Sequence, residues 1–181
     1  MSDAGDEYLL ETLKSFKGLK SNAEKAMAQV DDDALHFQPD AESNSVAIIM
    51  KHLAGNMVSR FTDFLTSDGE KSWRDRDSEF IDDRLSRQEL FVRWEKGWSC
   101  LFDALKALSK EDLMKSVHIR GEEHSVIRAL QRQLVHYAYH TGQIIFLCKQ
   151  IRKEKFISLS IPKGQSSKFN QEMETNKKSR S

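Results

Sequence analysis

Apolar residues recur every three or four positions along four long stretches of the chain, at about residues 7–30, 46–65, 87–109 and 125–152. This period matches the turn of an α-helix, so each stretch predicts a helix with one apolar face. The third stretch has the clearest stripe, formed by Leu90, Trp94, Trp98, Leu101, Leu105 and Leu108. Because such faces are buried when helices pack against one another, the sequence predicts an all-α protein, a four-helix bundle.

Polar segments separate these stretches and set their expected ends. Ser43 or Ser45 is expected to cap the second helix, and Gly69 to stop it. The segment "SVHIRGEEHSV" alternates apolar and polar residues around Gly121, which predicts a short hairpin or an extended turn before the last long helix. We expect one domain over residues 1–170 and a polar, disordered tail over 171–181.

Composition narrows the functional classes. The 28 basic and 28 acidic side chains cancel, so we expect no nucleic acid partner. No apolar run approaches the roughly 20 residues that span a bilayer, so we expect no membrane insertion. Only two cysteines occur, Cys100 and Cys148, and "MSDAGDEYLL" lacks the pattern of a secretory signal. These features predict a cytoplasmic protein.

Two histidines interrupt the apolar pattern of the fourth stretch. His136 and His140 are one helical turn apart, so their rings share one face and could hold one ion. Alternatively, one ring packs in the core against a carbonyl while the other is half exposed. His52, in the second stretch, offers a third imidazole if these two helices are neighbours. Three neutral ligands with an open position are typical of a catalytic metal site, so we predict one here.

The other histidines and the acidic runs are weaker candidates. His36 lies in an acidic loop, and His118 and His124 flank the turn at Gly121. His124 directly precedes the fourth helix and could donate a hydrogen bond or carry a proton near the site, although it could equally be an ordinary turn residue. The acidic runs at 31–33 and 73–83 lack the spacing of a calcium loop, and we expect them on the solvated surface.

Three segments carry a family resemblance: "IIMKHLAGN" with His52, "HYAYHTGQI" with His136 and His140, and the closing "LSIPKGQS". Together they resemble the DinB and YfiT-like superfamily of metal-dependent enzymes, in an uncharacterised bacterial branch, over about Leu9 to Asn170. The resemblance implies a bundle connected up-down-down-up. It also implies that these three histidines hold one divalent ion, for which nickel, zinc, iron and manganese are all candidates.

The resemblance also implies a reaction class. Relatives include thiol S-transferases that use bacillithiol, mycothiol or glutathione, alongside hydrolases. We therefore expect a metal-dependent enzyme acting on a small molecule, either a transferase with a low-molecular-weight thiol as co-substrate or a hydrolase. The alternative is a non-catalytic helical module in which the metal staples the bundle or a dimer. A homodimer is expected because family members often pair, and the stripe containing Trp94 and Trp98 is either its surface or simply core.

Polar residues one turn from the expected ligands are candidates for substrate binding. Asn56 and Arg60 follow His52. Tyr139 and Gln143 lie beside the fourth-helix pair. The planar fork of Arg60 could pair with the carboxylate of a thiol cofactor. Alternatively, all four side chains brace the helices.

Overall fold

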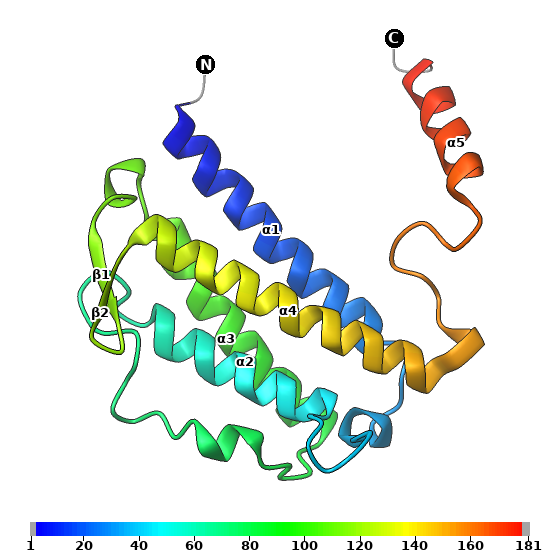
Figure 1. Cartoon of the computed structure of the whole chain (residues 1–181), viewed down its shortest axis with the longest axis horizontal. Coiled ribbons are helices and arrows are strands. Elements are labelled where there is room, and N and C mark those ends of the chain that lie inside the picture. Colours follow the sequence, from blue (N-terminus) through cyan, green and yellow to red (C-terminus); the bar gives the residue numbers. More distant parts are fainter. Residues whose placement is uncertain (1–2, 179–181) are drawn as a thin grey trace.

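The chain, seen here as a computed structural model that describes residues 3–178, is mainly helical (Figure 1). Four long helices lie side by side: α1 (Ala4–Met27), α2 (Val46–Phe61), α3 (Arg87–Ala107) and α4 (Val126–Arg152). α1 packs against α4, and α2 packs against both α3 and α4. Short 3-10 helices lie in the connections: η1 (Asp33–His36), η2 (Asp77–Phe80), η3 (Lys110–Asp112) and η4 (Lys153–Lys155). The predicted helical class is confirmed.

Each long helix begins at a side chain that caps its first amides. Asp3 accepts a hydrogen bond from the amide of Gly5 at the start of α1. Ser45, and not Ser43, caps α2, and Ser125 caps α4. α3 begins with a reciprocal capping box between Ser86 and Glu89. Such caps satisfy amides that have no partner inside the helix, which explains why the helices begin here.

The second helix ends earlier than its apolar stripe predicted. It stops at Phe61, because Thr62 is extended and Asp63 has a left-handed backbone with φ of 51°. The apolar Leu65 still packs against the core, but from a loop. The chain then runs through a long connection that includes η2, and η2 packs against α2. This connection carries side chains to the flank of α2, where the site lies.

The predicted hairpin is confirmed as two antiparallel strands, β1 (Ser116–Ile119) and β2 (Glu122–Ser125). Arg120 and Gly121 form the turn, with φ of 58° and 74°. Two successive left-handed residues are the requirement of the tightest hairpin turns, and glycine adopts that conformation freely. The carboxylate of Asp68 accepts hydrogen bonds from both turn amides, so the hairpin is fixed against the loop that follows α2.

The core lies between the four long helices. Trp94 and Trp98 are fully buried in it, so their stripe is core and not a dimer surface. The expected homodimer stays a prediction. α3 approaches α2 closely at Gly97, where an added Cβ would lie 2.9 Å from the Cα of Ala54.

The C-terminal segment differs from the expected disordered tail. The structure places Ser166–Lys178 in a fifth helix, α5, which lies apart from the other four in Figure 1. Its side chains are exposed as far as Thr175. Glutamine, glutamate, methionine and lysine favour helix locally, which explains a helix without tertiary packing. The expected tail also includes residues 179–181, which lie outside the described residues.

Membrane insertion can be tested on the same helices. Over the described residues, none of them combines the length and the apolar character needed to cross a bilayer.

Candidate metal centre

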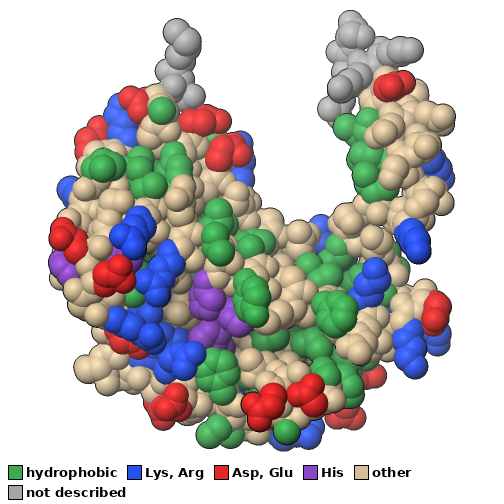
Figure 2. Space-filling view, in the orientation of Figure 1, with side chains coloured by type: hydrophobic (Ala, Val, Ile, Leu, Met, Phe, Trp, Pro, Cys, Tyr) green, Lys and Arg blue, Asp and Glu red, His purple; other side chains and the backbone are tan. Residues whose placement is uncertain are grey.

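The structure brings together the three histidines that the sequence analysis predicted as metal ligands. His52 comes from α2, and His136 and His140 come from α4. One ring nitrogen of each lies within 4.8 Å of the other two. The Nε2 atoms of His52 and His136 are 3.2 Å apart. Figure 2 shows histidine side chains at the surface of this face, between a basic patch and hydrophobic side chains.

The local sequence explains how the histidines meet. On α2, His52, Asn56 and Arg60 recur at one-turn spacing and form a polar stripe on a helix that is largely apolar and buried. On α4, His136 and His140 have the same spacing. Because α2 packs against α4, the two polar stripes face each other. The convergence therefore follows from helix periodicity and helix pairing.

A carboxylate outside the helices holds His52 in place. Nδ1 of His52 lies 2.9 Å from an oxygen of Glu79, in η2. Arg74 donates to both oxygens of the same carboxylate, at 2.8 Å each. Burial raises the pKa of Glu79, but the hydrogen bonds from His52 and Arg74 outweigh it and lower the pKa. The ionised carboxylate fixes the proton of His52 on Nδ1 and leaves Nε2 free, as in many metal sites.

The expectation that the acidic run at 73–83 is solvated surface is wrong for Glu79. Its side chain is 9% exposed, and that of Arg74 is only 2% exposed. A hint in the sequence was the apolar Phe80 next to Glu79 within the charged run. Its ring packs 4.8 Å from the ring of His52 and holds η2 against α2.

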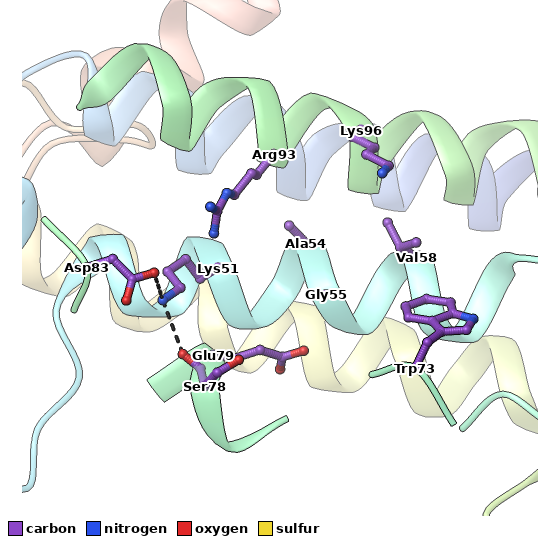
Figure 3. Close-up of a pocket in the computed structure, with 10 residues that line it drawn as sticks. All are labelled: Lys51, Ala54, Gly55, Val58, Trp73, Ser78, Glu79, Asp83, Arg93 and Lys96. Atoms are coloured by element: carbon purple, nitrogen blue, oxygen red, sulfur yellow. Dashed lines mark hydrogen bonds and ion pairs between the residues drawn. The ribbon is translucent and has the colours of Figure 1, made fainter. Parts of the chain in front are cut away.

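Gly55 makes room for this carboxylate. A Cβ at position 55 would lie 2.1 Å from an oxygen of Glu79, far inside any contact distance. Figure 3 shows Glu79 and Ser78 beside the Gly55 turn of α2, where they line a cavity of about 270 Å³ between α2, α3 and η2. Next to them, Lys51 donates to the carboxylate of Asp83 and to the carbonyl of Ser78. These bonds fasten η2 to α2.

The second nitrogen of His140 is also occupied. Nδ1 of His140 lies 2.8 Å from the side-chain oxygen of Gln143, so the ring donates there and Nε2 remains free. Gln143 thus braces a candidate ligand, as one of the alternatives from the sequence supposed. Tyr139 is 65% exposed, with its ring centroid 5.3 Å from that of His140. It lies at the outer edge of the site.

The imidazoles of His136 and His140 are neutral near neutral pH. Burial, followed by the charges of His140, His52, Arg60 and Arg74, lowers the pKa of His136 to about 3. Burial also lowers the pKa of His140. A histidine binds metal through the lone pair of its neutral form. These two rings can therefore bind a divalent cation without first losing a proton.

Comparison with known proteins gives the family. A family model described as a protein of unknown function, DUF1572, matches residues 3–165, which include all four long helices and the three histidines. The chain belongs to the DUF1572 family. No curated protein matches it.

In this DUF1572 protein, a cavity of about 270 Å³ opens beside the triad, and Asn56 and Arg60 line it together with His52 and His136. Asn56 accepts a hydrogen bond from the hydroxyl of Tyr137 at 2.9 Å. Arg60 donates to the carbonyl of Gly69 and to Glu70. Both side chains therefore brace the site as well as line it. The pairing of Arg60 with a cofactor carboxylate stays a prediction, with only Nε lacking a partner.

The expected contact between His124 and the site is not seen in the part of the chain that the structure describes. His124 lies in β2 opposite Val117 and is buried. It belongs neither to the histidine cluster nor to the lining of the cavity. Neither ring nitrogen has a hydrogen bond, and the nearest carboxylate oxygen, from Glu122, is 3.5 Å away. Strand alternation places its side chain on the buried face of the hairpin.

Proposed function

We propose that His52, His136 and His140 hold one divalent metal ion, and that the chain is a metal-dependent enzyme of the DinB-like type. The observation that carries this proposal is the convergence of three imidazoles beside an open cavity. DUF1572 is a DinB-like family, which supports the assignment. The proposal includes the up-down-down-up order of α1 to α4 that this type has.

The donor set fits a metal on its own chemistry. Two nitrogens bound to one zinc ion at about 2.1 Å each are roughly 3.4 Å apart in a tetrahedral site. The Nε2 atoms of His52 and His136 are 3.2 Å apart. Glu79 and Gln143 occupy the opposite nitrogens of two of the rings, which is the usual support of metal-binding histidines. Imidazole ligands suit nickel, zinc and iron, with manganese as a further candidate.

The proposed reaction is thiol S-transfer or hydrolysis. A metal ion held by neutral imidazoles acts as a Lewis acid, which favours the thiolate of a bound thiol or the hydroxide of a bound water. Glu79 accepts the Nδ1 hydrogen bond of His52 and so holds this ring in one orientation. Gln143 does the same for His140. The chain thereby presents fixed lone pairs on one side of the cavity and leaves the other side for a small molecule.

The cavity supports catalysis over a purely structural metal. A structural site is closed by four protein ligands, whereas a catalytic site keeps one position open. Three histidines and a cavity of about 270 Å³ leave that position. Free Cys100 and Cys148 suit the reducing cytoplasm in which low-molecular-weight thiols act, and we propose that location.

The test starts with untagged protein, whose metal content is measured before and after loading with nickel, zinc, iron or manganese. Loaded protein is assayed with bacillithiol, mycothiol or glutathione and an electrophilic haloaromatic compound, and separately with ester and amide substrates. We expect turnover by the wild type and by His118→Ala, an exposed histidine in β1, and none by His140→Ala. Turnover that persists in His140→Ala, or in protein stripped of metal, would contradict the proposal.

A further inference from the structure

The cavity beside the histidines is lined by arginines. No aspartate or glutamate is among its described lining residues. The five arginines that line it are Arg60, Arg74, Arg76, Arg120 and Arg132. The whole chain has no net charge, so this accumulation is local. Figure 2 shows the corresponding basic patch directly beside the histidines. A concave site walled by one sign of charge attracts the opposite charge.

Two nearby carboxylates neutralise only part of the positive charge of these arginines. Glu79 is held by Arg74 through two hydrogen bonds. Glu70 is shared by Arg60 and Arg120, at 3.0 Å from each. Three guanidinium groups are therefore balanced by two carboxylates, and two more arginines add to the excess.

Those two arginines have guanidinium groups available for a ligand. Arg132 lies on α4 one turn before His136 and has no ion-pair partner in the part of the chain that the structure describes. Among the described residues, the one ion-pair partner of Arg76 is Asp77, at 3.9 Å, and the side chain of Asp77 is 99% exposed. Its guanidinium lies 4.8 Å from the ring centroid of Phe80, the residue that packs on His52. Both arginines thus line the same cavity as the triad, one from α4 and one from the loop beside α2.

A buried donor in the same cavity also lacks an acceptor. Arg60 is 5% exposed, and its Nε has no hydrogen bond partner among the described residues. A buried donor left unpaired is costly, and native proteins rarely retain one without a reason. An acceptor oxygen from a ligand in the cavity would satisfy it. The orphaned group is a donor, as the binding of an anion requires.

We propose that this cavity binds an oxyanion group of the substrate, a phosphate or a carboxylate, with Arg76 and Arg132 as its direct contacts. The proposal rests on the proposed function in that the anion's neighbour is the metal-binding triad. A guanidinium fork matches the oxygens of either group with two parallel hydrogen bonds. A cavity of about 270 Å³ admits such a group on a small molecule, and not a nucleic acid duplex.

The test is isothermal titration calorimetry, which measures how the metal-stripped full chain binds inorganic phosphate, malonate and a short DNA duplex. Stripping the metal keeps the anions from binding to it. The variants are Arg132→Gln and Arg76→Gln, and the matched control is Arg128→Gln. Arg128 is also exposed on α4, one turn from Arg132, but is paired with Glu122 and does not line the cavity.

We expect phosphate or malonate to bind, the stronger of the two identifying the group. Each test variant should weaken binding roughly tenfold, the size typical of a lost charged hydrogen bond, while Arg128→Gln binds like the wild type. Equal binding by all three variants, no binding of either anion, or duplex binding that phosphate does not displace would overturn the proposal. Metal content is measured on the same preparations. Anion binding without metal uptake would defeat only the proposed function, and metal uptake without anion binding only this inference.

Discussion

Nδ1 of His52 donates a hydrogen bond to Glu79, across 2.9 Å. This bond links α2 to η2, which lies in a charged segment that the sequence predicted to be solvated surface. The same contact turns Nε2 of His52 toward His136. Arg74 holds the other side of the carboxylate. The geometry of the histidine triad therefore depends on two residues that do not belong to it.

The first prediction concerns Glu79→Gln. The amide keeps the size of the carboxylate but loses its charge, so the pair with Arg74 weakens and His52 is held less firmly. We expect metal affinity to fall by roughly 10- to 100-fold, as is typical when a residue that hydrogen-bonds a metal-binding histidine is replaced. Competition titration with a metal-binding dye measures the affinity. Asp77→Asn, two residues away with a 99% exposed side chain, is the control and should bind like the wild type.

The second prediction concerns Gly55→Ala. The added methyl would meet a carboxylate oxygen of Glu79 at 2.1 Å, so this side chain must leave its place beside His52 and Arg74. We expect a loss of about 1–3 kcal/mol in the free energy of unfolding, typical of overpacking, together with weaker metal binding. Urea unfolding of the metal-free protein gives the first quantity.

Gly18→Ala is the matched control for this substitution. Gly18 also lies within a helix, α1, but nothing lies within 4 Å of a Cβ there. Alanine should therefore stabilise the protein by about 0.5–1 kcal/mol through the lower entropy of its unfolded chain. If both variants were stabilised alike, the contact between Glu79 and Gly55 would not exist in solution.

Local patterns explain which parts of the fold the sequence could predict. The four helices follow from apolar periodicity, because each buries one face. His136 and His140 could be paired from their spacing alone. Their union with His52 required the further assumption that α2 and α4 are neighbours, and in the structure they are in contact.

Long-range contacts explain what the sequence could not predict. Glu79 and Arg74 look like any members of a charged run, and only tertiary packing buries them. The end of α2 depends on the left-handed backbone of Asp63, which competes with an apolar stripe that continues to Leu65. The arginines around the cavity are scattered over 73 positions from Arg60 to Arg132, without a shared motif.

The third prediction is a pH dependence of stability in the metal-free protein. His136 has a pKa of about 3 when folded, against 6.5 for the ordinary side chain. Between these values the unfolded chain binds a proton that the folded chain excludes. The free energy of unfolding should therefore fall as the pH drops below 6.5, by at most about 1.4 kcal/mol per pH unit from this group. The lowered pKa of His140 acts in the same direction.

Chemical unfolding between pH 7.5 and 5 measures this slope, above the range in which Glu79 titrates. His136→Asn should flatten it, because asparagine has no proton to gain. His118→Asn, at an exposed position in β1, should leave it unchanged. A wild-type stability that is constant over this range would mean that His136 is not buried as described.

The fourth prediction concerns the C-terminal segment. α5 is exposed and lies apart from the other helices, so removing the residues after Asn170 should leave the core intact. The thermal midpoint should shift by less than about 2 °C, because no buried apolar area is lost. Circular dichroism follows the transition. Loss of cooperative unfolding on truncation would indicate that this segment packs against the domain after all.

The most direct test of the metal centre is the stoichiometry of metal binding to untagged, metal-stripped protein. Nickel and zinc are titrated by calorimetry into the wild type, His52→Ala, His136→Ala, His140→Ala and the control His118→Ala. We predict one ion per chain for the wild type and the control, with affinity lost strongly in each of the other three. Wild-type protein that takes up neither nickel, zinc, iron nor manganese, or a His52→Ala variant that binds as tightly as the wild type, would contradict the assignment.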